Sequence, residues 1–192
     1  MTGFAALISR LSHPFLVPVP TLVAALRLDG VGWSAAIAWS VVCIAVGIVP
    51  PTLLLIVQRR RHGDRDWYVT VREQRFGLYA LGLACLAALI AMARFGGAPR
   101  LLLPCLVAAL AATAIGAALN RVTKVSVHVG AATGCALLLA FLAPQAAPAL
   151  AAAVALVAWS RLRLSHHTPW EVGLGAGVAA TCMAASLAAF GV

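Results

Sequence analysis

The sequence predicts an all-α protein, a polytopic transmembrane helical bundle with six to seven membrane segments. Of its 192 residues, 63% are hydrophobic and 10% are charged, whereas a soluble domain contains about 45–50% apolar and about 25% charged residues. The apolar residues form runs of roughly 20, which is the length of helix that crosses the hydrocarbon core of a bilayer. Helices are expected because lipid offers the backbone no other hydrogen-bond partners.

Seven apolar segments are the expected helices. They comprise residues 4–26, 33–57, 76–93, 101–119, 122–143, 147–159 and 169–190. The composition does not change along the chain, which predicts a single integral-membrane domain over residues 1–192. Pro14, Pro18 and Pro20 interrupt the first segment, so residues 1–30 are expected to be a peripheral element or an extra first span, and not a cleavable signal peptide.

Small residues inside these segments are expected to serve helix packing. Gly173, Gly175 and Gly177 would let the last segment approach its neighbours closely. The five cysteines all lie in apolar runs, and no C-x-x-C spacing occurs among them. They are therefore expected to be buried thiols, and no disulfide framework and no metal site are predicted.

The charge is distributed very unevenly between the connections. The net charge is +9, which in a chain of this hydropathy indicates loops that face anionic headgroups, so membrane lipids and not nucleic acid are the expected partners. If each segment crosses once, all of the 14 lysines and arginines except Arg27, Arg94 and Arg100 lie on one side. The positive-inside rule places that side in the cytoplasm of a multi-pass protein of the cell membrane.

The connection before the last segment holds the strongest candidate for chemistry. His167 and Glu171 are four residues apart, with Thr168 as the expected cap of the helix and Pro169 in its first turn. At that spacing the carboxylate is expected to bind one imidazole nitrogen and leave the other free as a nucleophile or base. A helix N-terminus also favours a bound anion.

Two further groups of polar residues lie on the same side. Lys124, Ser126 and His128 alternate at the beginning of an apolar segment, and Lys124 and His128 are expected on one helix face. Arg72 and Arg75 are three residues apart, and their forked donors suit phosphate oxygens. The combined set of cations, hydroxyl, imidazoles and carboxylate suits phosphoryl transfer, which depends on positioning and on neutralising charge.

The spacing of these residues resembles that of the type 2 phosphatidic acid phosphatase superfamily, the lipid phosphate phosphatases related to vanadium haloperoxidases. The third motif of that family, S-R-x5-H-x3-D, matches Ser160, Arg161, His167 and Glu171, with Glu in place of Asp. This spacing selects His167 and not His166. The resemblance covers residues 63–190, which would be the phosphatase-like core.

The other two motifs of the family match less well. The second, P-S-G-H, keeps only Ser126 and His128. For the first, K-x6-R-P, two registers are open: Arg65 with Arg72 shows the spacing, while Arg75 is followed by Phe76 in place of proline.

The resemblance implies a metal-independent phosphatase without a cofactor that acts on a lipid phosphate. His167 would attack phosphorus and become a phosphohistidine, Glu171 would orient it, and His128 would protonate the leaving oxygen and then activate water. The phosphate oxygens would be held by Arg161, Ser126, Lys124, Arg72 and Arg75.

The residues leave two other classes open. Ionisable groups in spans can also form an ion or proton path of a transporter, although here they gather at span ends on one side. The degenerate motifs also allow a non-catalytic member of the same fold. These residues do not specify which lipid is the substrate or whether it carries a monophosphate or a diphosphate. They are equally compatible with hydrolysis and with phosphotransfer.

Overall fold

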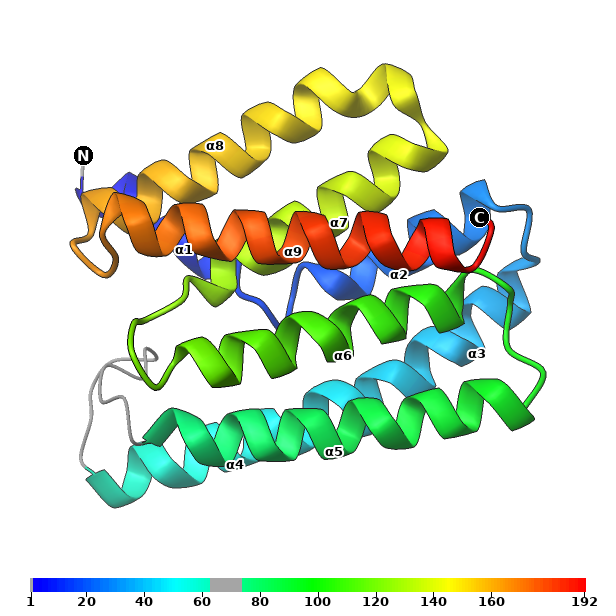
Figure 1. Ribbon diagram of the computed structural model, residues 1–192, viewed down its shortest axis with the longest axis horizontal. Coiled ribbons are helices and arrows are strands. Elements are labelled where there is room, and N and C mark those ends of the chain that lie inside the picture. Colours follow the sequence, from blue (N-terminus) through cyan, green and yellow to red (C-terminus); the bar gives the residue numbers. More distant parts are fainter. Residues whose placement is uncertain (1, 63–73) are drawn as a thin grey trace.

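The structure, a computed structural model, describes residues 2–62 and 74–192, and this part of the chain is helical without any strand (Figure 1). The helices run along the long axis of the molecule and confirm the predicted all-α class. Their bounds are α1 Thr2–Leu11, α2 Pro18–Leu28, α3 Trp33–Cys43, η1 Ile44–Ile48, α4 Val49–His62, α5 Gln74–Phe95, α6 Leu102–Leu119, α7 Val127–Leu142, η2 Pro144–Ala146, α8 Ala147–Arg163 and α9 Pro169–Ala189.

Within the described residues, five helical stretches are long and apolar enough to cross a membrane. They are Trp33–Arg60, Arg75–Phe95, Leu102–Leu119, Pro144–Arg163 and Pro169–Ala189. Two other apolar helices, α2 and α7, are shorter. Many large apolar side chains, such as those of Leu11, Leu53 and Phe95, face outward, which suits contact with lipid. The expected count of six to seven crossings stays a prediction.

The second expected segment is one continuous helix with a widened turn in its middle. The π-helical turn η1 joins α3 to α4, and the Val49 N–H donates to the carbonyl of Ile44, five residues earlier. Pro50 and Pro51 follow directly and have no N–H groups, so the usual i to i−4 bonds cannot form there. The wider turn accommodates this interruption.

The first expected segment is divided into two short helices that pack into the bundle. Ser12 and His13 follow α1, and Pro14 is in the turn before α2. α1 packs against α8, where the rings of Phe4 and Trp159 are 6.0 Å apart. α2 packs against α3 and α7, and its Leu26 is completely buried. The helices α1 and α2 therefore contribute to the core.

The last helix, α9, packs against both α6 and α7. A Cβ atom at Gly175 would lie 2.5 Å from the carbonyl oxygen of Ser126, and one at Gly130 would lie 3.2 Å from the carbonyl oxygen of Gly175. At 2.5 Å from a backbone oxygen only glycine fits at position 175, so the expectation of close packing is confirmed for Gly175. It is wrong for Gly173 and Gly177, because a Cβ atom at either position would meet nothing within 4 Å.

Candidate active site

The polar connections meet at one end of the bundle. The α6–α7 and α8–α9 connections and the beginning of α5 all lie at the left end in Figure 1, with α1 beside them. The candidate residues of these connections are more than 30 residues apart in the sequence. The helix topology therefore brings them towards one another.

The beginning of α9 fixes the carboxylate of Glu171. Thr168 is the N-cap, and its hydroxyl oxygen accepts a hydrogen bond from the Glu171 N–H at 3.3 Å. The Glu171 Oε2 atom in turn accepts from the Thr168 N–H at 3.1 Å, which completes a capping box. Pro169 occupies the first turn. The cap and the early proline expected from the sequence are both confirmed.

His167 is bound to this carboxylate. Its Nδ1 atom is 2.9 Å from Glu171 Oε2, and the two side chains are 5% and 15% exposed. A carboxylate accepts hydrogen bonds, so Nδ1 carries the proton, and Nε2 keeps its lone pair while the ring is neutral. The contact expected from the four-residue spacing is confirmed.

The surroundings of His167 keep its imidazole neutral. Burial lowers the pKa of His167 to about 4; the hydrogen bond to Glu171 opposes this shift, and the charges of Arg161 and Arg75 add to it. A neutral ring with a free Nε2 lone pair is the form required of a nucleophile.

Arg161 is the most deeply buried charged group described at the site. It lies in the last turn of α8, is 2% exposed, and its Nη1 atom donates to the hydroxyl of Ser9 on α1. Its charge acts on His13, His128 and His167. A buried guanidinium surrounded by imidazoles favours the binding of an anion among them.

Ser126 and His128 join the site from the beginning of α7. Ser126 caps that helix, is completely buried, and its N–H donates to the backbone carbonyl of Glu171 at 3.1 Å. Its hydroxyl has no hydrogen-bond partner among the described residues. His128, in the first turn, is buried, and the charges of Arg161 and His167 reach it. The starts of α7 and α9 are therefore joined directly.

The expected position of Lys124 is wrong. α7 begins only at Val127, after Ser126 with its extended backbone (φ −78°, ψ 96°), so Lys124 precedes the helix and cannot share a helical face with His128. It is half-buried in the α6–α7 connection. In the described part of the chain, no hydrogen bond or ion pair joins its side chain to the other candidates.

Of the candidate arginines around the start of α5, the structure describes only Arg75. Arg75 lies in the first turn of α5, and its charge acts on both Glu171 and His167. Arg72, and Arg65 of the alternative register, lie outside the described residues.

Two polar residues of the N-terminal region belong to this cluster and were not among the candidates. Ser9 binds Arg161, and the ring of His13 contacts that of His128, with centroids 5.5 Å apart and planes at 77°. Their signal in the sequence is the presence of polar and ionisable groups within an apolar segment. Nothing in the spacing connects residues 9 and 13 with residues 128 and 161.

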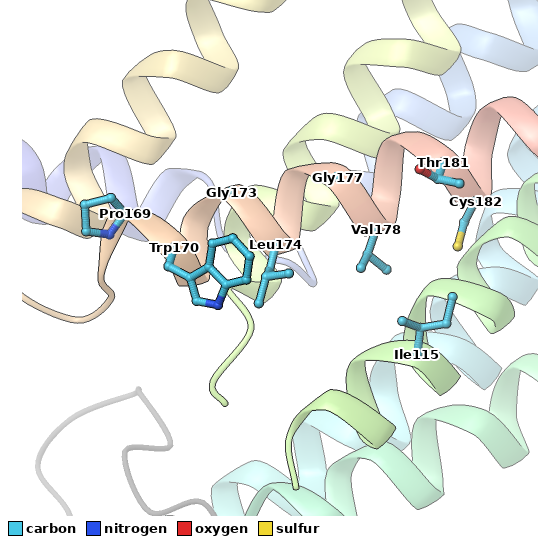
Figure 2. Close-up of a pocket in the computed structure, with 9 residues that line it drawn as sticks. All are labelled: Ile115, Pro169, Trp170, Gly173, Leu174, Gly177, Val178, Thr181 and Cys182. Carbon is cyan, nitrogen blue, oxygen red and sulfur yellow. The ribbon is translucent and has the colours of Figure 1, made fainter. Parts of the chain in front are cut away.

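An apolar groove begins beside the site and follows α9 (Figure 2). Its volume is about 390 Å³, and it is lined by Pro169, Trp170, Leu174 and other residues of α9 and by Ile115 of α6. Gly173 and Gly177 lie on this face. Their lack of a side chain leaves the groove open and explains why they do not take part in helix packing.

Comparisons of the chain with models of known protein families, with curated proteins and with solved structures gave no match. The assignment of a function therefore depends on the geometry of these side chains.

Proposed function

We propose that this protein is a membrane phosphatase that hydrolyses a lipid phosphate or diphosphate through a phosphohistidine at His167. The observation that carries the proposal is the hydrogen bond of 2.9 Å between His167 and Glu171 at the beginning of α9, beside the buried Arg161. It combines an oriented imidazole with a fixed positive charge and a helix N-terminus, and all three favour attack on a phosphate group.

The first step transfers the phosphoryl group to the protein. Nε2 of His167 attacks phosphorus, the bond from phosphorus to the lipid oxygen breaks, and His128 gives its proton to the leaving oxygen. The negative charge of the bound phosphate favours the protonated form of His128, which can then act as the acid.

The second step restores the free site. His128 takes a proton from water, the resulting hydroxide attacks the phosphohistidine, and the bond from phosphorus to nitrogen breaks to release inorganic phosphate. Arg161, Arg75 and the Ser126 hydroxyl hold the phosphate oxygens in both steps. Lys124 and Arg72 are proposed to bind the same oxygens. The reaction needs no metal ion and no cofactor.

A lipid is the proposed substrate because of what surrounds the site. The groove of Figure 2 begins at Pro169 and Trp170, next to Glu171, and its lining is almost entirely apolar. A polyprenyl or phospholipid chain suits such a lining. The excess of basic residues in the polar connections supports a site at the cytoplasmic face.

The test is phosphate release by the purified protein in detergent from a panel of polyprenyl and phospholipid mono- and diphosphates. Wild type and His166→Ala should be active, and His167→Ala should be inactive. With a ³²P-labelled substrate, acid quenching should release the label from wild type, and mild alkali should retain it, as for a phosphohistidine. Equal activity of wild type and His167→Ala would contradict the proposal. No release from the whole panel would favour a transporter or a non-catalytic protein.

A further inference from the structure

The turn between α1 and α2 lies against the proposed active site. His13 in this turn contacts His128 on α7, and Ser9 in α1 contacts Arg161 on α8. His128 and Arg161 both belong to the proposed active site. The region that contacts them contains none of the motif residues. The packing of α1 on α8 holds this region in position.

The imidazole of His13 is fixed in its tautomer and its orientation. Its Nδ1 atom accepts a hydrogen bond from the Phe15 N–H at 3.3 Å, so in the neutral ring the proton is on Nε2. The Phe15 ring packs against it, with centroids 5.3 Å apart. Burial and the charge of Arg161 lower the pKa of His13, which is therefore neutral at physiological pH.

The contact between the two imidazoles restricts His128. The ring planes are almost perpendicular, at 77°, which is the edge-to-face arrangement that aromatic pairs favour. A buried ring held in this way cannot tilt out of its plane without losing the contact. The contact therefore fixes the plane of the His128 ring, in which the nitrogen that would give a proton to the leaving oxygen lies.

Ser9 restricts Arg161 in a similar way. Its side chain is completely buried, and its hydroxyl oxygen accepts from Nη1 of the guanidinium. A hydroxyl orients the planar guanidinium without neutralising it, whereas a carboxylate at this position would cancel the charge that phosphate requires.

We infer that the N-terminal segment completes the active site, with His13 as a positioning residue for His128 and Ser9 as a positioning residue for Arg161. The inference rests on the proposed function and adds to it two residues from outside the motifs. It predicts that substitution of His13 impairs the proton transfer from His128 to the leaving oxygen. Substitution of Ser9 should instead weaken the binding of phosphate by Arg161.

The test for His13 uses two substrates that differ in their leaving group. An alkyl lipid phosphate needs a proton on its leaving oxygen, whereas p-nitrophenyl phosphate does not. His13→Ala should lower kcat/KM by about 10- to 100-fold for the lipid and less than about threefold for the aryl ester, because general acid catalysis contributes about 10²- to 10⁴-fold. His13→Phe keeps a flat ring and should recover most of the activity.

Phe4→Ala is the matched control, because it removes a ring contact between α1 and α8 but no side chain of the proposed site. It should affect both substrates equally and weakly. Equal losses on both substrates for His13→Ala, or no loss at all, would overturn the role of His13. The role of His13 would also be overturned if His13→Phe lost as much activity as His13→Ala.

The test for Ser9 measures inhibition by inorganic phosphate. Ser9→Ala should raise the inhibition constant about tenfold, because a hydrogen bond to a charged group orients the guanidinium. Ser12→Ala is the matched control: Ser12 is also buried, but its hydroxyl faces the carbonyl of Ser9 at 3.5 Å. Equal effects of the two variants would overturn the role of Ser9.

A measurement without catalysis separates this inference from the proposed function. In thermal unfolding, the shifts of His13→Ala and His128→Ala should not add in the double variant, because the two rings contact each other. Coupled shifts in a protein that releases no phosphate would contradict the proposed function but leave the contact intact. Additive shifts would overturn the contact.

Discussion

At the scale of the residue, the Glu171 carboxylate serves two neighbours at once. It accepts from His167 Nδ1 and from the Thr168 N–H. Glu171→Gln keeps an oxygen for the helix cap but removes the charge that stabilises a charged His167. We expect the rate of phosphohistidine formation to fall about 10²- to 10⁴-fold, as when the acid of a catalytic triad becomes an amide. Rapid quenching with labelled substrate measures it.

Thr168→Ala distinguishes catalysis from helix capping in that experiment. The variant removes the hydroxyl that accepts from the Glu171 N–H and should lower the free energy of unfolding by about 1 kcal/mol. It should change the rate of phosphohistidine formation far less than Glu171→Gln does. Equal rate losses in both variants would show that Glu171 acts through the cap alone.

The titration of His167 gives a second prediction at this scale. Its pKa of about 4 in the folded protein lies below the value of about 6.5 in an unfolded chain. The ¹⁵N NMR signal of its Nε2 atom, identified by its loss in His167→Gln, should therefore stay that of a neutral ring from pH 7 down to about 5. A titration midpoint near 6.5 would contradict the buried, charge-flanked site.

The same difference makes stability depend on pH. Since the unfolded state binds this proton more tightly, the contribution of His167 to stability is fully present above pH 6.5 and is lost as the pH falls towards 4. Thermal unfolding between pH 7 and 4 should show a steeper decrease for wild type than for His167→Gln.

Local spacing determined which site residues were predictable. The contact between His167 and Glu171 was predicted correctly from their separation of four residues at a capped helix start, although His167 itself precedes α9. Lys124 shows the same spacing to His128, but the extended Ser126 begins the helix only after it. Ser9 and His13 reach the site through the packing of α1 on α8, a contact that no local pattern records.

At the scale of the element, the contact between α7 and α9 joins the fold to the site. Gly175→Ala would place a Cβ atom 2.5 Å from the Ser126 carbonyl oxygen. The helices must then separate, which should cost about 1–3 kcal/mol of unfolding free energy and weaken the bond from the Ser126 N–H to Glu171. Thermal unfolding, with phosphate release measured in parallel, should show both losses.

Gly173→Ala is the matched control on the same helix. Its Cβ atom would meet nothing within 4 Å, and alanine favours a helix over glycine by up to about 1 kcal/mol. Stability should therefore be unchanged or slightly higher. A loss as large as that of Gly175→Ala would show that the close approach of α7 is not its cause.

The ends of the helices were predictable where side chains mark them. The start of α9 at Pro169, after a capping threonine, follows from the sequence, and so does the end of α6 at Leu119. The division of the first segment into α1 and α2 was anticipated only as an interruption by prolines. The π turn η1 could not be predicted from hydropathy, because the whole of residues 33–57 is apolar.

At the scale of the whole molecule, composition is sufficient to predict an all-helical apolar bundle, because hydrophobicity and segment length are sums over many residues. The pairing of helices is not such a sum. The packing of α1 on α8, and of α9 between α6 and α7, depends on which small or polar groups face each other. These contacts decide which residues form the site.

The orientation in the membrane is the last prediction, and it decides which leaflet supplies the substrate. Arg60, near the end of α4, and Phe95, at the end of α5, are both exposed and lie at opposite ends of a helix pair. The basic connections belong to the end with Arg60, which the positive-inside rule assigns to the cytoplasm. In a variant without the five native cysteines, a membrane-impermeant maleimide should label Phe95→Cys in intact cells, but Arg60→Cys only after permeabilisation. The reverse pattern would place His167 at the outer leaflet, where the substrate would be a lipid phosphate exposed outside the cell, and the excess of arginines would then reflect phosphate binding and not topology.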